Sequence, residues 1–238
     1  MILSVCIPVY NQDVTVLVSS LLNQTRQTNG LVNIVLIDDH SNTTFQEKNK
    51  AISDEVKYIT LEKNIGRSKI RNKFLEYSNS NYFLFIDCDS TIISDNYIAS
   101  YLDILENKTP SVLVGSSVYQ SERPALKHRL RWRYGRQRES QTYRARVANP
   151  NASFKTNNFV ISRDCFLNQS FNEELKGYGH EDTLFGYELN KKNIKIEHLD
   201  NPVLNGELDT NDEFLIKTEE GLINLLKVWE LTNQDSFL

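Results

Sequence analysis

The chain has 238 residues, of which 39% are hydrophobic and 24% are charged, and this composition argues against an intrinsically disordered protein. No apolar stretch is long enough to span a bilayer, which argues against a membrane-spanning architecture. The net charge of −4 conceals a basic block, because residues 123–146 carry nine Lys or Arg and one acid, a local charge of +8 that leaves −12 for the rest of the chain.

The first half of the chain alternates short apolar runs with longer amphipathic stretches, the pattern of a mostly parallel sheet covered by helices. Together with the length, this pattern predicts one large α/β domain with a C-terminal helical appendage. Strands are predicted at residues 2–7, 33–37, 56–61, 82–86 and 111–119, and helices at residues 14–23, 67–76 and 95–106.

Beyond residue 119 the pattern becomes irregular and basic, and regular structure is expected to resume at residues 159–162. A Gly-Tyr-Gly turn at residues 177–179 leads into a predicted helix at 183–190, followed by a strand at 193–197. A last helix is predicted at residues 212–229. Its apolar stripe predicts core packing or a partner surface and consists of Leu215, Leu222, Leu225, Leu226 and Trp229.

The basic block leaves three interpretations open: a solvated charged face, a surface that contacts phosphates, or a surface for an anionic polymer or an anionic membrane. Within it, Leu126, Leu130 and Tyr134 recur every four residues, which predicts a short amphipathic helix. We expect the middle of the chain to be a mobile segment of the site.

The start of the chain and its cysteines indicate a compartment. Residues 1–10 carry no basic leader and are typical of a first strand rather than of a secretory signal. The three cysteines, Cys6, Cys88 and Cys165, are widely spaced and odd in number. These features predict a reducing, cytoplasmic location, and the basic block is compatible with the inner face of a membrane.

The apolar run at residues 83–86 ends abruptly in Asp87 and Asp89. Side chains alternate along a strand, so both carboxylates are expected on one side where the backbone leaves the sheet. Two such groups repel each other unless a positive charge lies between them, and hard oxygen ligands suit Mg²⁺ or Mn²⁺. The motif therefore predicts a metal site for a phosphorylated substrate, although Asp and Ser are also ordinary turn formers.

Further signals follow other predicted strands. The first strand ends in Pro8-Val9-Tyr10-Asn11, and the second ends in the acid pair Asp38-Asp39. Residues 64–67, Asn-Ile-Gly-Arg, and the pair Arg71-Asn72 flank a helix start. Each signal alone has a purely structural explanation as a strand end or a turn, but their order is specific.

With these motifs, the chain resembles the inverting, nucleotide-sugar-dependent glycosyltransferases of family 2 over residues 2–204. The resemblance implies a GT-A fold, a Rossmann-like α/β fold with a mixed, mostly parallel central sheet flanked by helices. It also implies a nucleotide-sugar-binding half at residues 1–119, an acceptor-side half with a basic flap at 120–210, and a C-terminal helix at 211–238.

The same resemblance implies the donor site. Asp87 is expected near the ribose and Asp89 on a divalent metal, Mn²⁺ or Mg²⁺. The nucleobase is expected between the end of the first strand and the second acid of the Asp38-Asp39 pair. The residues implicated are Pro8, Val9, Tyr10 and Asp39. The donor-side motif comprises Asn64, Gly66, Arg71 and Asn72.

Two later motifs, residues 155–159 (Lys-Thr-Asn-Asn-Phe) and 177–182 (Gly-Tyr-Gly-His-Glu-Asp), resemble a bacterial branch related to chondroitin polymerases and galactosyltransferases. An inverting displacement needs a base that takes the acceptor hydroxyl proton, and we predict Asp182 for this role. Glu181 is expected to accept a hydrogen bond from an acceptor sugar, with Gly179 and His180 beside it. Acids at a helix start also stabilise the exposed N–H groups, so capping is a compatible explanation.

Two assignments depend on looser parts of the resemblance. Related transferases often supply a C-terminal histidine to the metal, which makes His198 a candidate, although Asn205 lies where a histidine is otherwise expected. The basic block is expected to be a flap that orders over the donor diphosphate, because arginine suits phosphate geometry. Trp132 and Tyr134 are candidates for stacking on a sugar.

The predicted function is metal-dependent, inverting transfer of a sugar, with UDP as the expected nucleotide, to a saccharide or lipid-linked acceptor in surface polysaccharide synthesis. The rival enzyme is a haloacid-dehalogenase-type phosphatase with Asp87 as nucleophile and Asp89 as general acid. Two predicted βα units precede the motif, which argues against it. A nucleic-acid-binding protein is the other alternative, and the acidic remainder of the chain argues against it.

Overall fold

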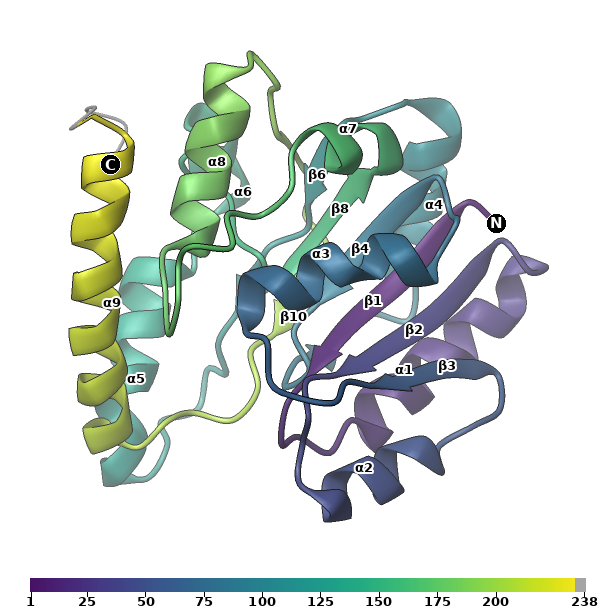
Figure 1. Cartoon of the computed structure of the whole chain (residues 1–238), viewed down its shortest axis with the longest axis horizontal. Coiled ribbons are helices and arrows are strands. Elements are labelled where there is room, and N and C mark those ends of the chain that lie inside the picture. The colour runs from purple at the N-terminus through teal and green to yellow at the C-terminus, as the bar shows by residue number, and fades with distance from the viewer. Residues whose placement is uncertain (234–238) are drawn as a thin grey trace.

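The computed structural model describes residues 1–233, and the last five residues of the predicted C-terminal segment lie outside this range. Its central feature is a seven-stranded sheet in the order β3-β2-β1-β4-β8-β6-β9 (Figure 1). β8 runs antiparallel to β4 and β6, while the other neighbouring pairs are parallel. The strands are β1 (Leu3–Val9), β2 (Val32–Asp38), β3 (Val56–Thr60), β4 (Tyr82–Ile86), β6 (Val112–Val114), β8 (Asn158–Ser162) and β9 (Glu197–His198).

Helices cover both faces of this sheet because its strands are apolar on both sides. Leu3 and Val5 of β1 pack in one core cluster together with α1 (Thr15–Thr25) and α4 (Tyr97–Asn107). Cys6 belongs to the opposite cluster, which includes α3 (Arg67–Tyr77), α7 (Arg163–Asn168) and α8 (Glu181–Lys191). This three-layer arrangement confirms the predicted mixed α/β class. The remaining helical elements of the first half are η1 (Arg26–Thr28) and α2 (Thr43–Lys50).

The prediction of a single strand at residues 111–119 is wrong, because the segment divides between two sheets. β6 ends at Val114, and β7 (Ser117–Val118) joins β5 (Thr91–Ile92) and β10 (Val203–Leu204) in a second, three-stranded sheet. Ser116 adopts a left-handed backbone with φ of 72°. A Cβ atom at Gly115 would lie 1.9 Å from the hydroxyl oxygen of Tyr101, so only glycine fits at the break.

The basic middle of the chain is helical rather than irregular. It forms η2 (Leu126–His128), α5 (Arg129–Tyr134), η3 (Gly135–Glu139) and α6 (Tyr143–Ala148). A helix at the predicted segment is confirmed, but its apolar face is not buried, because Leu126, Leu130 and Tyr134 are 71%, 40% and 47% exposed. The predicted strand at residues 193–197 is wrong. Ile194 N–H donates to Leu189 O at the end of α8, and the strand in this region is the short β9, Glu197–His198.

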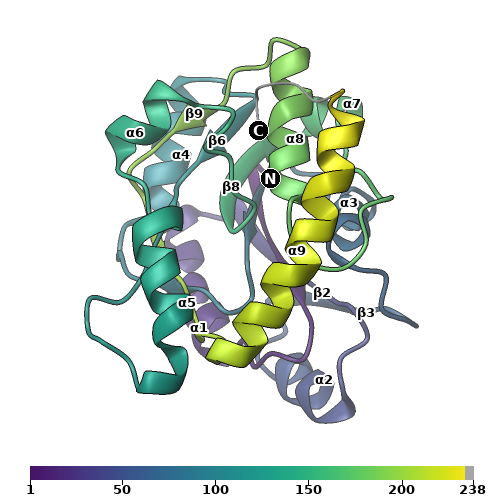
Figure 2. The ribbon, with the colours of Figure 1, turned by 90° about the vertical axis from the view of Figure 1, so that its left-hand side faces the viewer.

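The C-terminal helix α9 (Asn211–Leu231) begins with a capping box between Thr210 and Glu213. It contacts α5, and both helices lie on one side of the molecule (Figure 2). Its buried residues are Phe214, Gly221, Asn224 and Val228. Core packing by the predicted apolar stripe is therefore wrong for four of its residues, whereas its alternative role as a partner surface stays a prediction. The exposed residues are Leu215 (55%), Leu222 (56%), Leu226 (60%) and Trp229 (44%). No helix within residues 1–233 has both the length and the apolar character needed to cross a bilayer.

Candidate active site

The ends of β1 and β2 meet the turn that precedes α3. Asp39 N–H donates to Val9 O at 2.8 Å, and the Asp39 carboxylate accepts from the amides of Ile65 (2.7 Å) and Gly66 (2.9 Å). Gly66 has φ of +85°, a conformation that disfavours residues with a Cβ atom. Burial raises the pKa of Asp39 despite these hydrogen bonds. Three predicted donor-site residues, Val9, Asp39 and Gly66, are thus brought together.

Asp38, the first acid of the pair, has a structural role. One oxygen accepts from Ser41 N–H at 2.6 Å, and the other accepts from the Tyr58 hydroxyl at 2.7 Å. Burial and this carboxylate raise the pKa of Tyr58. Because both Asp38 oxygens are engaged with neighbouring elements, the second acid is the one that faces the turn before α3.

A buried arginine connects the two predicted halves of the site. Arg71, whose side chain is 2% exposed, lies 3.0 Å from an Asp87 oxygen and 3.5 Å from a Glu181 oxygen. Arg67, at the first position of α3, lies 3.8 Å from the same Glu181 oxygen and stacks over the Tyr178 ring at 5.0 Å. A buried charge needs such partners, so Arg71 fixes Asp87 and Glu181 relative to each other.

Asp89 follows the end of β4 and is accessible to solvent. The protein around it and the neighbouring Asp87 carboxylate raise its pKa to about 6. The return segment after β10 lies against it, since a Cβ atom on Gly206 would clash with the Asp89 backbone oxygen at 1.7 Å. A like charge, Asp87, thus lies near the accessible Asp89 carboxylate, an arrangement that a bound cation would stabilise.

Unpaired polar atoms mark the same strand end. Asn157 O accepts from Asp87 N–H at 3.3 Å, and Asn157 Nδ2 donates to Asn205 Oδ1 at 3.2 Å. Within the described residues, Asn157 Oδ1 and Ser90 Oγ are buried and have no hydrogen-bond partner. Oxygen atoms without partners beside Asp87 and Asp89 fit an oxygen-coordinated divalent cation with donor phosphates in its shell.

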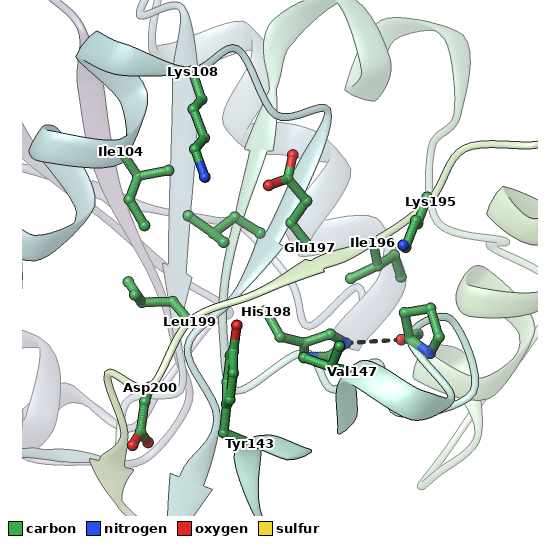
Figure 3. Close-up of a pocket in the computed structure, with 12 residues that line it drawn as sticks. Ile104, Lys108, Tyr143, Val147, Lys195, Ile196, Glu197, His198, Leu199 and Asp200 are labelled. Carbon is green, nitrogen blue, oxygen red and sulfur yellow. Dashed lines mark hydrogen bonds between the residues drawn. The ribbon is translucent and has the colours of Figure 1, made fainter. Parts of the chain in front are cut away.

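Within residues 1–233, no group of three or more His, Cys, Asp or Glu side chains is placed to hold a metal by itself. His198 does not complete such a group. Its Nε2 bonds to Pro150 O at 3.0 Å, its Nδ1 accepts from Arg146 Nε at 3.4 Å, and it lines a cavity of about 430 Å³ beside β9 (Figure 3). With both ring nitrogens engaged, the structure contradicts the expected metal-ligand role of His198.

The predicted base lies at the start of α8. Asp182 Oδ2 accepts from Lys155 Nζ at 2.8 Å, and Oδ1 accepts from Thr183 N–H at 2.8 Å. Burial opposes ionisation of Asp182, but the Lys155 charge and these two hydrogen bonds outweigh it and lower the pKa. Asp182 is thus an ionised carboxylate with a fixed orientation.

The loop before α8 has an unusual backbone. Gly177, Gly179 and His180 have φ values of 79°, 91° and 67°, all in the left-handed region. His180 Nδ1 lies 3.2 Å from Thr183 Oγ1, and burial lowers the pKa of His180. This turn places Glu181 and Asp182 at the first two positions of α8.

The predicted flap aromatics have partners within the protein. Trp132 Nε1 donates to Gln120 O at 2.8 Å, and the Tyr134 ring packs 5.3 Å from the Phe214 ring. Arg131 pairs with Glu139 at 3.0 Å. Through Trp132 and Tyr134 the basic segment is attached to the chain that follows β7 and to α9, and stacking of either ring on a sugar stays a prediction.

Three further residues of the predicted donor site have simpler surroundings. Tyr10 is 54% exposed and Asn64 is exposed, whereas Pro8 is partly buried opposite Ile37 in the sheet. Asn72 is structural: its side chain donates to Phe171 O at 3.0 Å and accepts from Phe171 N–H at 2.9 Å.

Four residues of the site were not assigned a role from the sequence. Arg67 and Lys155 lie inside the motifs at residues 64–67 and 155–159, so their positions in those motifs could have identified them as site residues. Lys217, which lies 5.5 Å from the Tyr178 ring centroid, and Asn224 come from α9. Their pattern in the sequence is that of an ordinary amphipathic helix, which carries no signal for a site.

Comparison with known proteins bears on this arrangement. A search of curated proteins finds no match. The structure resembles that of Staphylococcus aureus TarS 1–349 (TM-score 0.62, 23% identity, 98% of this chain and 64% of that one). It also resembles the mannosyltransferase PcManGT from Pyrobaculum calidifontis (0.70, 13%, 98% and 64%) and glucosyl-3-phosphoglycerate synthase from Mycobacterium tuberculosis (0.67, 16%, 95% and 79%).

These likenesses show a shared fold, the GT-A fold, and the chain spans 64% of the length of TarS 1–349. The model of the family described as glycosyl transferase family 2 matches residues 4–171. That match covers well over half of the chain. It includes the end of β1 and the acids at the ends of β2 and β4. The chain therefore belongs to glycosyl transferase family 2.

Proposed function

We propose that this glycosyltransferase transfers a sugar, with inversion, from a UDP-sugar to a hydroxyl of a saccharide or lipid-linked saccharide, and that it depends on a divalent metal. One observation carries the proposal: buried Arg71 connects Asp87, at the predicted donor site, to Glu181, beside the predicted base. Residues 1–119 would bind the nucleotide sugar and residues 120–210 the acceptor.

Several structural neighbours were crystallised with the expected ligands. TarS 1–349 was solved with UDP-GlcNAc and with UDP, and glucosyl-3-phosphoglycerate synthase with UDP and Mn²⁺ or Mg²⁺. PcManGT was solved with GDP-Man and Mn²⁺. These ligands favour a nucleoside diphosphate and a divalent cation for this protein as well, and they leave UDP and GDP as the nucleotides to compare.

In the proposed reaction, Asp182 accepts the proton of the acceptor hydroxyl while that oxygen attacks the anomeric carbon and the bond to the nucleoside diphosphate breaks. Asp182 is suited to this role because it is ionised and held by Lys155 and Thr183. Glu181 would orient the acceptor sugar. A divalent cation bound by Asp89 would offset the charge of the departing diphosphate.

The phosphatase alternative has less support. Its nucleophile would be Asp87, but one Asp87 oxygen is engaged at 3.0 Å by the buried guanidinium of Arg71, which also contacts Glu181. Membership of the glycosyltransferase family also argues against it. We further propose a role in surface polysaccharide synthesis on the cytoplasmic side of the membrane, with no nucleic-acid partner.

The test is calorimetric titration of UDP in the presence and absence of Mn²⁺, followed by a screen of UDP-sugars. Binding that requires Mn²⁺ in the wild type and is lost in Asp89→Asn would support the donor site. The matched control is Asp103→Asn on α4, which should leave binding unchanged. Failure of UDP, GDP and dTDP to bind would overturn the proposal, and release of phosphate from simple esters would favour the phosphatase.

A further inference from the structure

The loop that delivers Glu181 and Asp182 is held by a single side chain from α9. Asn224 Nδ2 donates to the backbone oxygens of Lys176 (3.0 Å), Tyr178 (3.1 Å) and Gly179 (3.2 Å). An amide nitrogen carries two hydrogens, so the three carbonyls share them. Asn224 is 2% exposed, which makes these contacts part of the interior.

The loop needs an external support because of its backbone. Gly177, Gly179 and His180 adopt left-handed conformations, which interrupt the regular hydrogen bonding of helix and strand. Loop carbonyls that face the buried Asn224 side chain need a hydrogen-bond donor there, because an unpaired polar group away from water costs free energy. Asn224 supplies the partner for three carbonyls within four consecutive residues.

The surroundings of Asn224 bring α9 close to the same loop. A Cβ atom on Gly179 would lie 3.4 Å from the Gly221 Cα atom, so two glycines allow the helix and the loop to approach. Lys217 lies 5.5 Å from the centroid of the Tyr178 ring, and Arg67 of α3 lies 5.0 Å from it. Tyr178 is therefore held by cations from α9 and from the helix that starts the donor-side motif.

We propose that Asn224 is a positioning residue of the transfer reaction, which fixes the loop at residues 176–180 and thereby places Glu181 and Asp182 against the acceptor. This inference rests on the proposed function of Asp182. The family match ends at residue 171, so the clamp belongs to a part of the chain that the family model does not cover. Asn224 acts through the loop and is not placed in contact with substrate.

The decisive variant is Asn224→Asp, which keeps the size of the side chain but replaces the donor by oxygens that repel the three carbonyls. We expect kcat/KM for transfer to fall about 100-fold, the effect of a reacting group displaced by roughly 1 Å. The affinity for UDP with Mn²⁺ should stay within about twofold of the wild-type value, because Val9, Asp39 and Gly66 of the donor site are held by hydrogen bonds to one another.

Two comparisons separate positioning from general loss of structure. Asn107→Asp makes the same chemical change at the exposed end of α4 and should leave both measurements unchanged. Asn224→Ser retains one hydroxyl donor, so it should lose less transfer activity than Asn224→Asp, and it serves if the aspartate variant does not fold. Hydrogen exchange should become faster at residues 176–184 of either Asn224 variant and unchanged at β1.

The outcomes distinguish this inference from the proposed function. A wild-type protein without transfer activity would refute the proposed function. An active wild type with an equally active, folded Asn224→Asp variant would refute the positioning role. Equal losses of UDP affinity and of transfer would also refute it, because a clamp specific to the acceptor loop leaves the donor site intact.

Discussion

The donor-side and acceptor-side regions of the site are held together in different ways. At the donor side, Asp39 bonds to Val9 and to the amides of Ile65 and Gly66, all from neighbouring strands and the turn that follows them. At the acceptor side, Asp182 depends on Lys155, 27 positions away, and the loop before it on Asn224. The donor side is therefore supported by backbone groups at the ends of β1 and of the turn before α3, and the acceptor side by two single side chains, Lys155 and Asn224.

Asp182→Asn should separate the two sides most clearly. Removal of a general base typically costs about 10²- to 10⁴-fold in rate, so transfer should nearly disappear. The donor region does not depend on Asp182, and UDP binding should therefore persist. Steady-state rates combined with calorimetry measure both quantities, and intact transfer would reject Asp182 as the base.

The side chain of Asn158 in β8 bonds to residues of both the donor-side and the acceptor-side halves, so its removal should lower the stability of the fold. Its Oδ1 accepts from the hydroxyls of Tyr97 (2.7 Å) and Tyr101 (2.6 Å), and its Nδ2 donates to the oxygens of Ser116 (2.7 Å) and Asn201 (2.9 Å). Asn158→Ala leaves four buried groups without this partner, so the free energy of unfolding should fall by about 3 kcal/mol.

Tyr101→Phe provides a graded comparison for Asn158→Ala. It removes one of the four hydrogen bonds and should cost about 1 kcal/mol of unfolding free energy. Urea denaturation measures both variants. If the two variants lost the same unfolding free energy, the other three hydrogen bonds of Asn158 would not contribute to stability.

A smaller effect is expected from Lys155→Met. The Lys155 charge helps to lower the pKa of Asp182, so its removal should raise that pKa and shift the acidic limb of the kcat/KM profile to higher pH. Loss of activity relative to wild type should thus be larger at low pH than at high pH. Lys155→Arg keeps the charge and should retain the wild-type profile, whereas parallel profiles for the methionine variant would contradict the electrostatic role.

The smallest effect is expected on the exposed face of α9. Leu226 is 60% exposed, and Leu226→Ser should change the free energy of unfolding by no more than about 0.5 kcal/mol. Val228 lies two positions further on the same helix and is fully buried, so Val228→Ala should cost about 2 kcal/mol. Thermal unfolding of the two variants compares the faces, and a large loss in Leu226→Ser would show that the exposed face is packed in solution.

Much of the first half was predictable because its signals are local. The predicted strand at residues 82–86 coincides with β4, and the helix predicted from residue 67 coincides with the start of α3. The break at Gly115 was not predicted, because it depends on the Tyr101 hydroxyl that occupies the space of a side chain. His198 was assigned by motif position, and its contacts with Pro150 and Arg146 appear only in the folded chain.

The layered α/β class and the acids at the ends of β2 and β4 could be read from the sequence, because hydrophobic periodicity and strand ends depend on neighbouring residues. Which charges pair across the site depends on how the chain folds. Arg71 joins Asp87 to Glu181, Lys155 holds Asp182, and Asn224 clamps the loop before α8. Each of these contacts joins segments far apart in sequence, and their distances are set by how the layers pack rather than by any local pattern.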